Sequence, residues 1–179
     1  MQTYIALFRG INIGGHNIIK MADLRGLLKD IGLRDVNSYI QSGNVIFRSE
    51  EVDPEQLAQD ISAKIAKKYD FEPRVLISKK GEFLHIMESN PFPEAETDSR
   101  RLHVFFLTEM IESPDLEGIE EVKRESEQYE LKENAFYLYA PEGIGRSKLV
   151  SQIDRLLGVP TTGRNWRTMR KIRQMAEEL

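Results

Sequence analysis

The chain has 179 residues, of which 40% are hydrophobic and 30% are charged, and it contains no cysteine. This composition excludes a disordered chain, and no apolar run approaches the roughly 18 residues that a membrane-spanning helix needs. The lack of cysteine excludes disulfides and cysteine zinc sites. Together with the absence of an apolar signal segment, it favours the cytoplasm.

The net charge is −4, yet residues 144–179 carry eight Lys/Arg against three Asp/Glu, and residues 109–133 carry ten acids against three bases. The basic end therefore indicates either an anionic partner or attraction to the acidic stretch.

The first half of the chain predicts the element order β-α-β-β-α-β. Strands are expected at Thr3–Arg9, Val36–Gln41, Val45–Arg48 and Pro73–Ser78. A helix is expected from Met21 to Ile31, where apolar residues recur at a period of 3.6. Gly43-Asn44 suits a tight hairpin, because glycine accepts the positive φ that such a turn requires. Asp53-Pro54 predicts the start of the second helix, with Gln56 placed to complete a capping box.

The second half repeats this order after the proline-containing segment 90–99. Helices are expected at Gly81–Glu88, Asp115–Arg124, Ser147–Leu157 and Trp166–Leu179, and strands at Arg101–Thr108, Glu127–Lys132, Ala135–Ala140 and Val159–Thr162. We therefore predict an α+β protein of two ferredoxin-like (βαββαβ) halves packed together, plus a C-terminal helix. The N-terminal half with its connecting helix is expected over residues 1–92, and the C-terminal half with the terminal helix over residues 100–179.

Five sequence blocks carry a resemblance to a known family. They are Phe8–Gly15, Tyr39–Phe47, Asn90–Phe92, Gly145–Lys148 and Thr162–Thr168. Together they resemble the bacterial domain-of-unknown-function family 1697, and they run in order through nearly the whole chain. The resemblance implies a two-part ferredoxin-like fold. It implies no activity, because none is established for the family, so no catalytic residue can be carried over.

The Arg9–Lys20 segment joins a strand end to a helix start and is the first candidate binding site. Gly14 and Gly15 would let backbone N–H groups approach a ligand closely. Side-chain donors for a phosphate or carboxylate would come from Arg9, Asn12, Asn17 and Lys20. The alternative is a long connection whose glycines only permit left-handed turns. We favour binding, because long loops inside compact domains are usually functional.

The Pro141–Lys148 segment is the second candidate, and Ser147 and Lys148 are its expected ligand-binding residues. A cation in the first helical turn opposes the helix dipole, so Lys148 is unfavourable there unless an anion lies nearby. The alternative is that Arg146 and Lys148 contact the acidic stretch 109–133.

Arg164 and Asn165 form the third candidate, at the predicted start of the terminal helix. Asn165 can cap that helix, and Arg164 has the same unusual placement as Lys148. If Arg9, Lys148 and Arg164 face one pocket, only an anionic ligand would stabilise their convergence.

We predict that the protein binds a small anionic ligand, bearing phosphate or carboxylate and including nucleotides, near these glycine-rich loops. The alternatives are a protein-interaction module and RNA binding on open sheet faces through Phe47, Phe105, Tyr137 and Tyr139. A missing RNA-recognition signature and the negative net charge disfavour RNA. No catalytic motif, cofactor motif or metal-ligand spacing is found, so no cofactor or metal is expected, and His16 is the histidine to test as an acid–base group. The ligand's identity, catalysis and the oligomeric state stay open.

Overall fold

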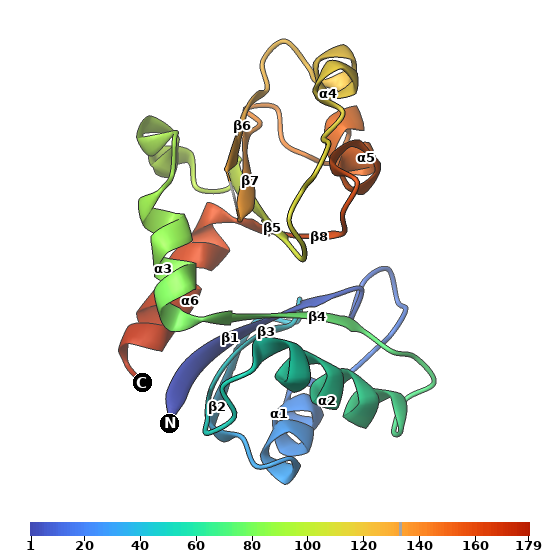
Figure 1. Cartoon of the computed structure of the whole chain (residues 1–179), viewed down its shortest axis with the longest axis vertical. Helices are drawn as coiled ribbons and strands as arrows, with labels where there is room; N and C mark the ends of the chain where they lie inside the picture. The colour runs from blue at the N-terminus through green and yellow to red at the C-terminus, as the bar shows by residue number, and fades with distance from the viewer. Residues whose placement is uncertain (133) are drawn as a thin grey trace. The chain divides into compact units, whose positions relative to one another are not determined.

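A computed structural model describes residues 1–132 and 134–179 (Figure 1). The chain divides into two compact units, the first formed by Met1–His85 with Lys171–Leu179 and the second by Ile86–Arg170. Glu133, the last residue of the acidic stretch, lies outside the described residues. None of the helices in the described part combines the length and the apolar character that crossing a membrane requires.

The first unit is built on a four-stranded sheet of order β2-β3-β1-β4, in which all neighbours are antiparallel. Its elements are β1 (Gln2–Arg9), α1 (Met21–Asp30), β2 (Arg34–Tyr39), β3 (Asn44–Ser49), α2 (Pro54–Ala66), β4 (Arg74–Lys79) and α3 (Lys80–Glu88), the last of which ends in the second unit. Helices α1 and α2 cover one face of this sheet (Figure 1). They bury Leu28 and Ile61 against Tyr4, Phe8 and Phe47 of the strands, which forms the core of the unit.

The second unit repeats this arrangement, with an antiparallel sheet of order β6-β7-β5-β8. Its elements are a 3₁₀ helix (Pro93–Asp98), β5 (Leu102–Leu107), α4 (Leu116–Val122), β6 (Gln128–Lys132), β7 (Ala135–Tyr139), α5 (Lys148–Leu157), β8 (Thr161–Asn165) and α6 (Trp166–Glu177), which ends in the first unit. Leu149 and Ile153 of α5 pack with Ile119 of α4 against Phe105 and Phe136 of the sheet. The predicted α+β class is therefore confirmed, with two antiparallel sheets of four strands each.

The predicted start of α2 at Asp53-Pro54 is confirmed, but the predicted capping box is not. The Asp53 carboxylate accepts a hydrogen bond from the Glu55 N–H at 2.9 Å, and Pro54 occupies the first helical position. Gln56 does not complete a capping box. Its side-chain amide instead donates to Asp60 one turn later, at 2.9 Å.

The turn between β2 and β3 differs from the expected one. Asn44 already belongs to β3 and pairs with Tyr39, so the connection is the four-residue segment 40–43 and not Gly43-Asn44. The reason is a tertiary contact: the Gly43 carbonyl accepts a hydrogen bond from the Phe8 N–H at 2.8 Å, which fixes the turn against β1. Gly43 has φ +74°, which glycine adopts without strain.

The last strand also lies later than predicted. We expected Val159–Thr162, whereas β8 covers Thr161–Asn165. Gly163 allows this because the ring of Phe105, its partner on β5, occupies the space that a side chain would need, with a ring carbon 2.7 Å from the position of a Cβ.

Candidate functional site

The Arg9–Lys20 segment folds into a small hairpin. At its tip the His16 N–H donates to the Ile13 carbonyl at 2.9 Å. Gly14 and Gly15 lie between them with φ of +58° and +80°, the left-handed values that a type I′ turn requires at both central positions. The glycines therefore build a tight turn, and all four residues of the tip are exposed.

The two asparagines of this segment hold the hairpin in place. The Asn12 side-chain amide donates to the carbonyls of Ile19 at 3.0 Å and Gln41 at 2.8 Å, and its oxygen accepts from the Ile19 N–H at 2.9 Å. The Asn17 amide donates to the Gly10 carbonyl at 2.8 Å. Asn12 has no N–H left for a ligand, because both of its amide hydrogens are used within the protein.

The two basic residues of the segment lie at its ends. Arg9 ends β1, opposite Arg74 of β4, and Lys20 immediately precedes α1, and both are exposed. The sequence-predicted residues Arg9, Asn12, Gly14, Gly15, Asn17 and Lys20 all belong to the first unit, while Ser147, Lys148, Arg164 and Asn165 all belong to the second. A common pocket for Arg9, Lys148 and Arg164 thus stays a prediction.

The Pro141–Lys148 segment leads directly into α5. The Ser147 hydroxyl accepts a hydrogen bond from the Val150 N–H at 3.2 Å and so caps this helix. Lys148 is the first helical residue, and no acidic residue lies in the first turn. The positive end of the α5 dipole is therefore not compensated by a carboxylate of the helix itself.

Arg101 lies against this segment, although sequence reasoning did not select it. A Cβ added to Gly143 would overlap the Arg101 guanidinium, so the two groups are in direct contact. Arg101 is half-buried, and its guanidinium makes no hydrogen bond or ion pair with any residue that the structure describes. Partly removing an unpaired charge from water is unfavourable.

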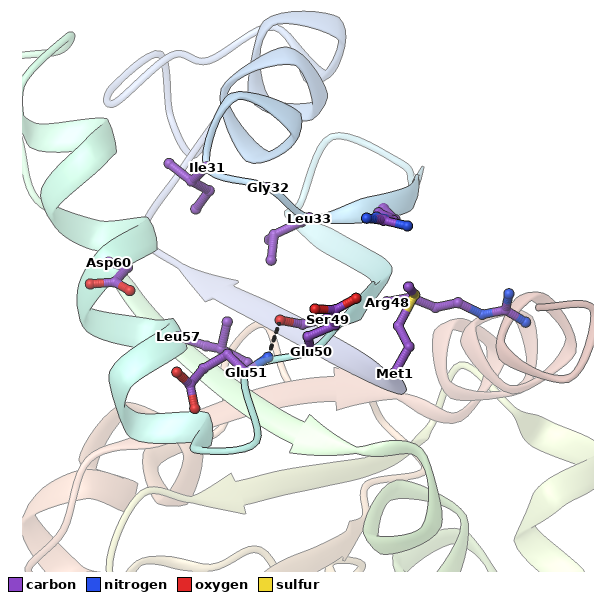
Figure 2. Close-up of a pocket in the computed structure, with 11 residues that line it drawn as sticks. Met1, Ile31, Gly32, Leu33, Arg48, Ser49, Glu50, Glu51, Leu57 and Asp60 are labelled. Carbon is purple, nitrogen blue, oxygen red and sulfur yellow. Dashed lines mark hydrogen bonds between the residues drawn. The ribbon is translucent and has the colours of Figure 1, made fainter.

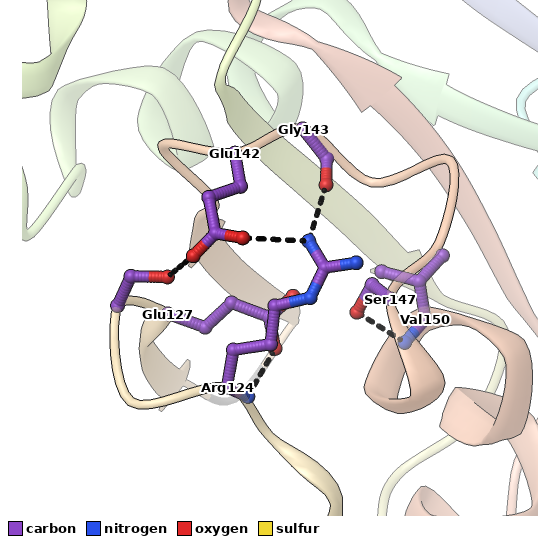
Figure 3. A network of polar contacts seen from close by, with 7 residues as sticks. Arg124, Glu127, Glu142, Gly143, Ser147 and Val150 are labelled. Atoms are coloured by element: carbon purple, nitrogen blue, oxygen red, sulfur yellow. Dashed lines mark hydrogen bonds and ion pairs between the residues drawn. The ribbon is translucent and has the colours of Figure 1, made fainter.

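A second arginine is neutralised by the same segment (Figure 3). The Arg124 guanidinium donates to the Gly143 carbonyl at 3.1 Å and lies 3.9 Å from the Glu142 carboxylate. Glu142 also accepts from the Ser126 hydroxyl at 2.5 Å, and the Arg124 N–H donates to the Glu127 carboxylate at 2.9 Å. Arg124 therefore holds the loop. Glu127 is buried, and its second carboxylate oxygen has no partner among the described residues.

The described residues give no support to the alternative explanation of Arg146 and Lys148. We considered that Arg146 and Lys148 contact the acidic stretch, but neither makes an ion pair with a described acidic residue. Within that stretch Glu120 pairs instead with Lys123 at 3.6 Å. The loop thus carries two exposed cations, and the half-buried Arg101 lies against its Gly143.

Arg164 lies in a strand and not at a helix start as expected. It belongs to β8, opposite Val104 of β5, because the strand continues to Asn165. Asn165 caps α6 as predicted, accepting from the Thr168 N–H at 2.9 Å. Burial lowers the pKa of the Arg164 guanidinium to about 10, since a charged group loses solvation there. The group nevertheless keeps its charge at neutral pH.

His103 and His16 differ in their exposure to solvent. His103 is buried in β5, and burial lowers its pKa to about 4, with the charge of Arg101 acting in the same direction. Its Nε2 has no hydrogen-bond partner among the described residues. His16 is exposed at the hairpin tip. In the described part of the chain, no three His, Asp or Glu side chains are grouped so that they would hold a metal ion.

The aromatic residues considered for RNA stacking are largely inside the protein. Phe47 and Phe105 are buried in the two hydrophobic cores beneath the helices. Tyr137 is buried, and its hydroxyl donates to the Ile86 carbonyl at 2.7 Å. Only Tyr139 is partly accessible. These four rings do not form an exposed stacking surface.

The two sheets of identical strand order, with the basic loop before α5, define an α+β protein of two similarly built units. The chain belongs to the family described as protein of unknown function (DUF1697), whose sequence profile matches residues 1–137. This confirms the resemblance seen in the sequence blocks, although the last two blocks lie beyond the matched residues. The structure is similar to that of a conserved bacterial protein from Streptococcus pneumoniae, with a TM-score of 0.75, 29% sequence identity and 98% of each chain covered. No curated protein matches the sequence significantly.

Proposed function

We propose that the protein binds a small anionic ligand, bearing a phosphate or carboxylate group, at the Pro141–Lys148 loop and the start of α5. The observation that carries this proposal is Arg101, a half-buried guanidinium that lies against Gly143 and has no acceptor among the described residues. An anion placed at the loop would supply charge-assisted hydrogen bonds to it, which are stronger than neutral ones.

Two further features support an anion at this place. Arg146 and Lys148 are exposed, and neither is paired with a described acid. The first turn of α5 contributes N–H groups and the positive end of a dipole, without an acid to compensate it. Arg124 is excluded from the binding set, because Glu142 and the Gly143 carbonyl already engage its guanidinium.

The first-unit hairpin is a less suitable place for the same ligand. Both hydrogens of the Asn12 side-chain amide are used within the protein, on the carbonyls of Ile19 and Gln41, and the Asn17 amide donates to the hairpin's own backbone. We therefore assign Asn12, Gly14, Gly15 and Asn17 of the hairpin to a structural role.

The test is thermal stabilisation of the whole chain by inorganic phosphate, pyrophosphate, citrate and a panel of nucleotides. A ligand at 100 times its dissociation constant stabilises a folded protein by about 2.7 kcal/mol. We expect stabilisation that decreases with added salt and that Arg101→Ala or Lys148→Ala removes. Arg155→Ala, at the other end of α5, is the matched control and should keep it. An equal response of wild type and both site variants, or no response to any anion, would refute the proposal.

We also assign each unit to the ferredoxin-like fold. In support of this, the first unit has the element order βαββαβ with strand order β2-β3-β1-β4, and the second unit has the equivalent order β6-β7-β5-β8. In both, the first strand of the unit lies between the third and fourth strands, and all neighbours are antiparallel. Such repetition is what the βαββαβ reading of the sequence requires.

A further inference from the structure

A cavity of about 250 Å³ lies in the first unit, where α1 ends, β2 begins and α2 passes nearby (Figure 2). Its apolar lining consists of the buried Leu33 and Leu57, the half-buried Ile31 and the exposed Met1. Charged residues surround this apolar part. None of them belongs to the loop before α5, so the cavity is independent of the anion site proposed above.

The basic part of the lining comes from two neighbouring strands. Arg34 of β2 and Arg48 of β3 are directly opposite each other in the sheet, and like charges in this position destabilise the pairing. Arg48 is partly compensated by Asp35, whose carboxylate is 3.4 Å from its guanidinium. Arg34 has no such partner among the described residues. An anionic group between the two strands would relieve this repulsion.

The acidic part of the lining comes mainly from α2 and the segment before it. Asp60 and Glu51 lie on the α2 side of the apolar centre in Figure 2, and Arg48 lies on the opposite side. Glu51 accepts from the backbone N–H groups of Val52 at 2.7 Å and Asp53 at 3.0 Å, and makes no ion pair with a described base. A cationic group on this side would meet the carboxylates of Asp60 and Glu51, neither of which forms an ion pair with a Lys or Arg side chain that the structure describes.

We propose that this cavity binds a small zwitterionic molecule, an α-amino acid with an apolar side chain. Its carboxylate would face Arg34, its ammonium group would face Asp60 and Glu51, and its side chain would cover Leu33 and Leu57. The size agrees with this class, because the volume corresponds to roughly eight water molecules.

The experiment titrates the whole chain with L-leucine and follows the NMR signals of the Gly32 amide and the Leu33 and Leu57 methyl groups. Two analogues separate the charged ends: isoamylamine has no carboxylate, and isocaproic acid has no ammonium group. We expect saturable shifts with leucine and weaker binding of both analogues by up to about fivefold, the effect of one lost exposed ion pair. Arg34→Gln and Asp60→Asn should each weaken leucine binding by a similar factor.

Two matched variants distinguish lining residues from general changes in charge. Lys29→Gln on α1 and Glu55→Gln on α2 alter exposed charges of the same unit that do not line the cavity, and both should bind leucine as the wild type does. An amine that binds as tightly as leucine, an acid that does so, or the absence of saturable shifts with leucine would each overturn the proposal.

Discussion

Substitution of Gly43 tests the most closely packed turn of the first unit. A Cβ at this position would lie 2.5 Å from the Cβ of Phe8 and 2.7 Å from the Cδ1 of Ile11, and both of these residues are buried. Alanine would also have to adopt φ +74°, where a side chain costs about 1 to 2 kcal/mol. Added atoms in a packed core cost about 1 to 3 kcal/mol more. We expect Gly43→Ala to destabilise the protein by about 2 to 5 kcal/mol.

Substitutions at two other glycines separate the backbone cost of Gly43→Ala from its packing cost. Gly32 has φ +90° and nothing within 4 Å of its added Cβ, so Gly32→Ala should show the backbone cost alone, about 1 to 2 kcal/mol. Gly26 lies inside α1, also without a close neighbour, so Gly26→Ala should stabilise the protein by about 0.5 to 1 kcal/mol.

Urea unfolding of the three variants measures these differences. With a slope of about 1 to 3 kcal/mol per molar urea, the midpoint of Gly43→Ala should fall by at least about 0.7 M relative to wild type. The reasoning is refuted if Gly43→Ala loses no more stability than Gly32→Ala, because the close approach to Phe8 and Ile11 would then have no energetic consequence.

Three further predictions each concern one side chain. Asp53→Ala removes the cap of α2 at Glu55 and should cost about 1 kcal/mol in urea unfolding. The pKa of His103 is about 4 in the folded protein and about 6.5 in the unfolded chain. As the pH falls below 6.5, the unfolded chain therefore binds a proton at His103 before the folded protein does. His103 thus contributes stability above pH 6.5 that is lost as the pH falls towards 4, by up to about 3 kcal/mol, and His103→Gln should flatten this part of the stability profile. Tyr137→Phe leaves the buried Ile86 carbonyl without its donor and should lower stability by about 1 to 3 kcal/mol, and an unchanged melting temperature would contradict the bond.

The element order could be predicted because it is encoded locally. The apolar residues of α1 and α5 recur at the helical period, and Asp53-Pro54 is a start signal that depends on neighbouring residues only. The bounds that were wrong depend on distant partners. The turn before Asn44 is set by the Phe8 N–H, and β8 extends through Gly163 because of the ring of Phe105. Neither contact has a signal in the adjacent sequence.

The candidate site was predictable only in part. The strand-to-helix loop and the position of Lys148 follow from glycines and helical periodicity, which are local patterns. The adjacent sequence gives no such signal for Arg101. Its contact with Gly143 arises because β5 pairs with β7, where Leu102 lies opposite Tyr139. The structural use of Asn12 could have been expected, because asparagine tolerates the left-handed φ of +54° that it adopts there.

The first unit consists of two segments that are far apart in the sequence, and this affects how it folds during synthesis in the cell. Residues Lys171–Leu179 belong to it, with Ile172 and Ala176 fully buried and the Lys80 ammonium group donating to the Ala176 carbonyl at 2.5 Å. A ribosome adds about 5 to 20 residues per second, so translation of Ile86–Arg170 separates the two parts of this unit by roughly 4 to 17 s. The unit whose translation begins first is therefore the last to be completed, and its nascent form is the stage at which a chaperone would find exposed apolar surface.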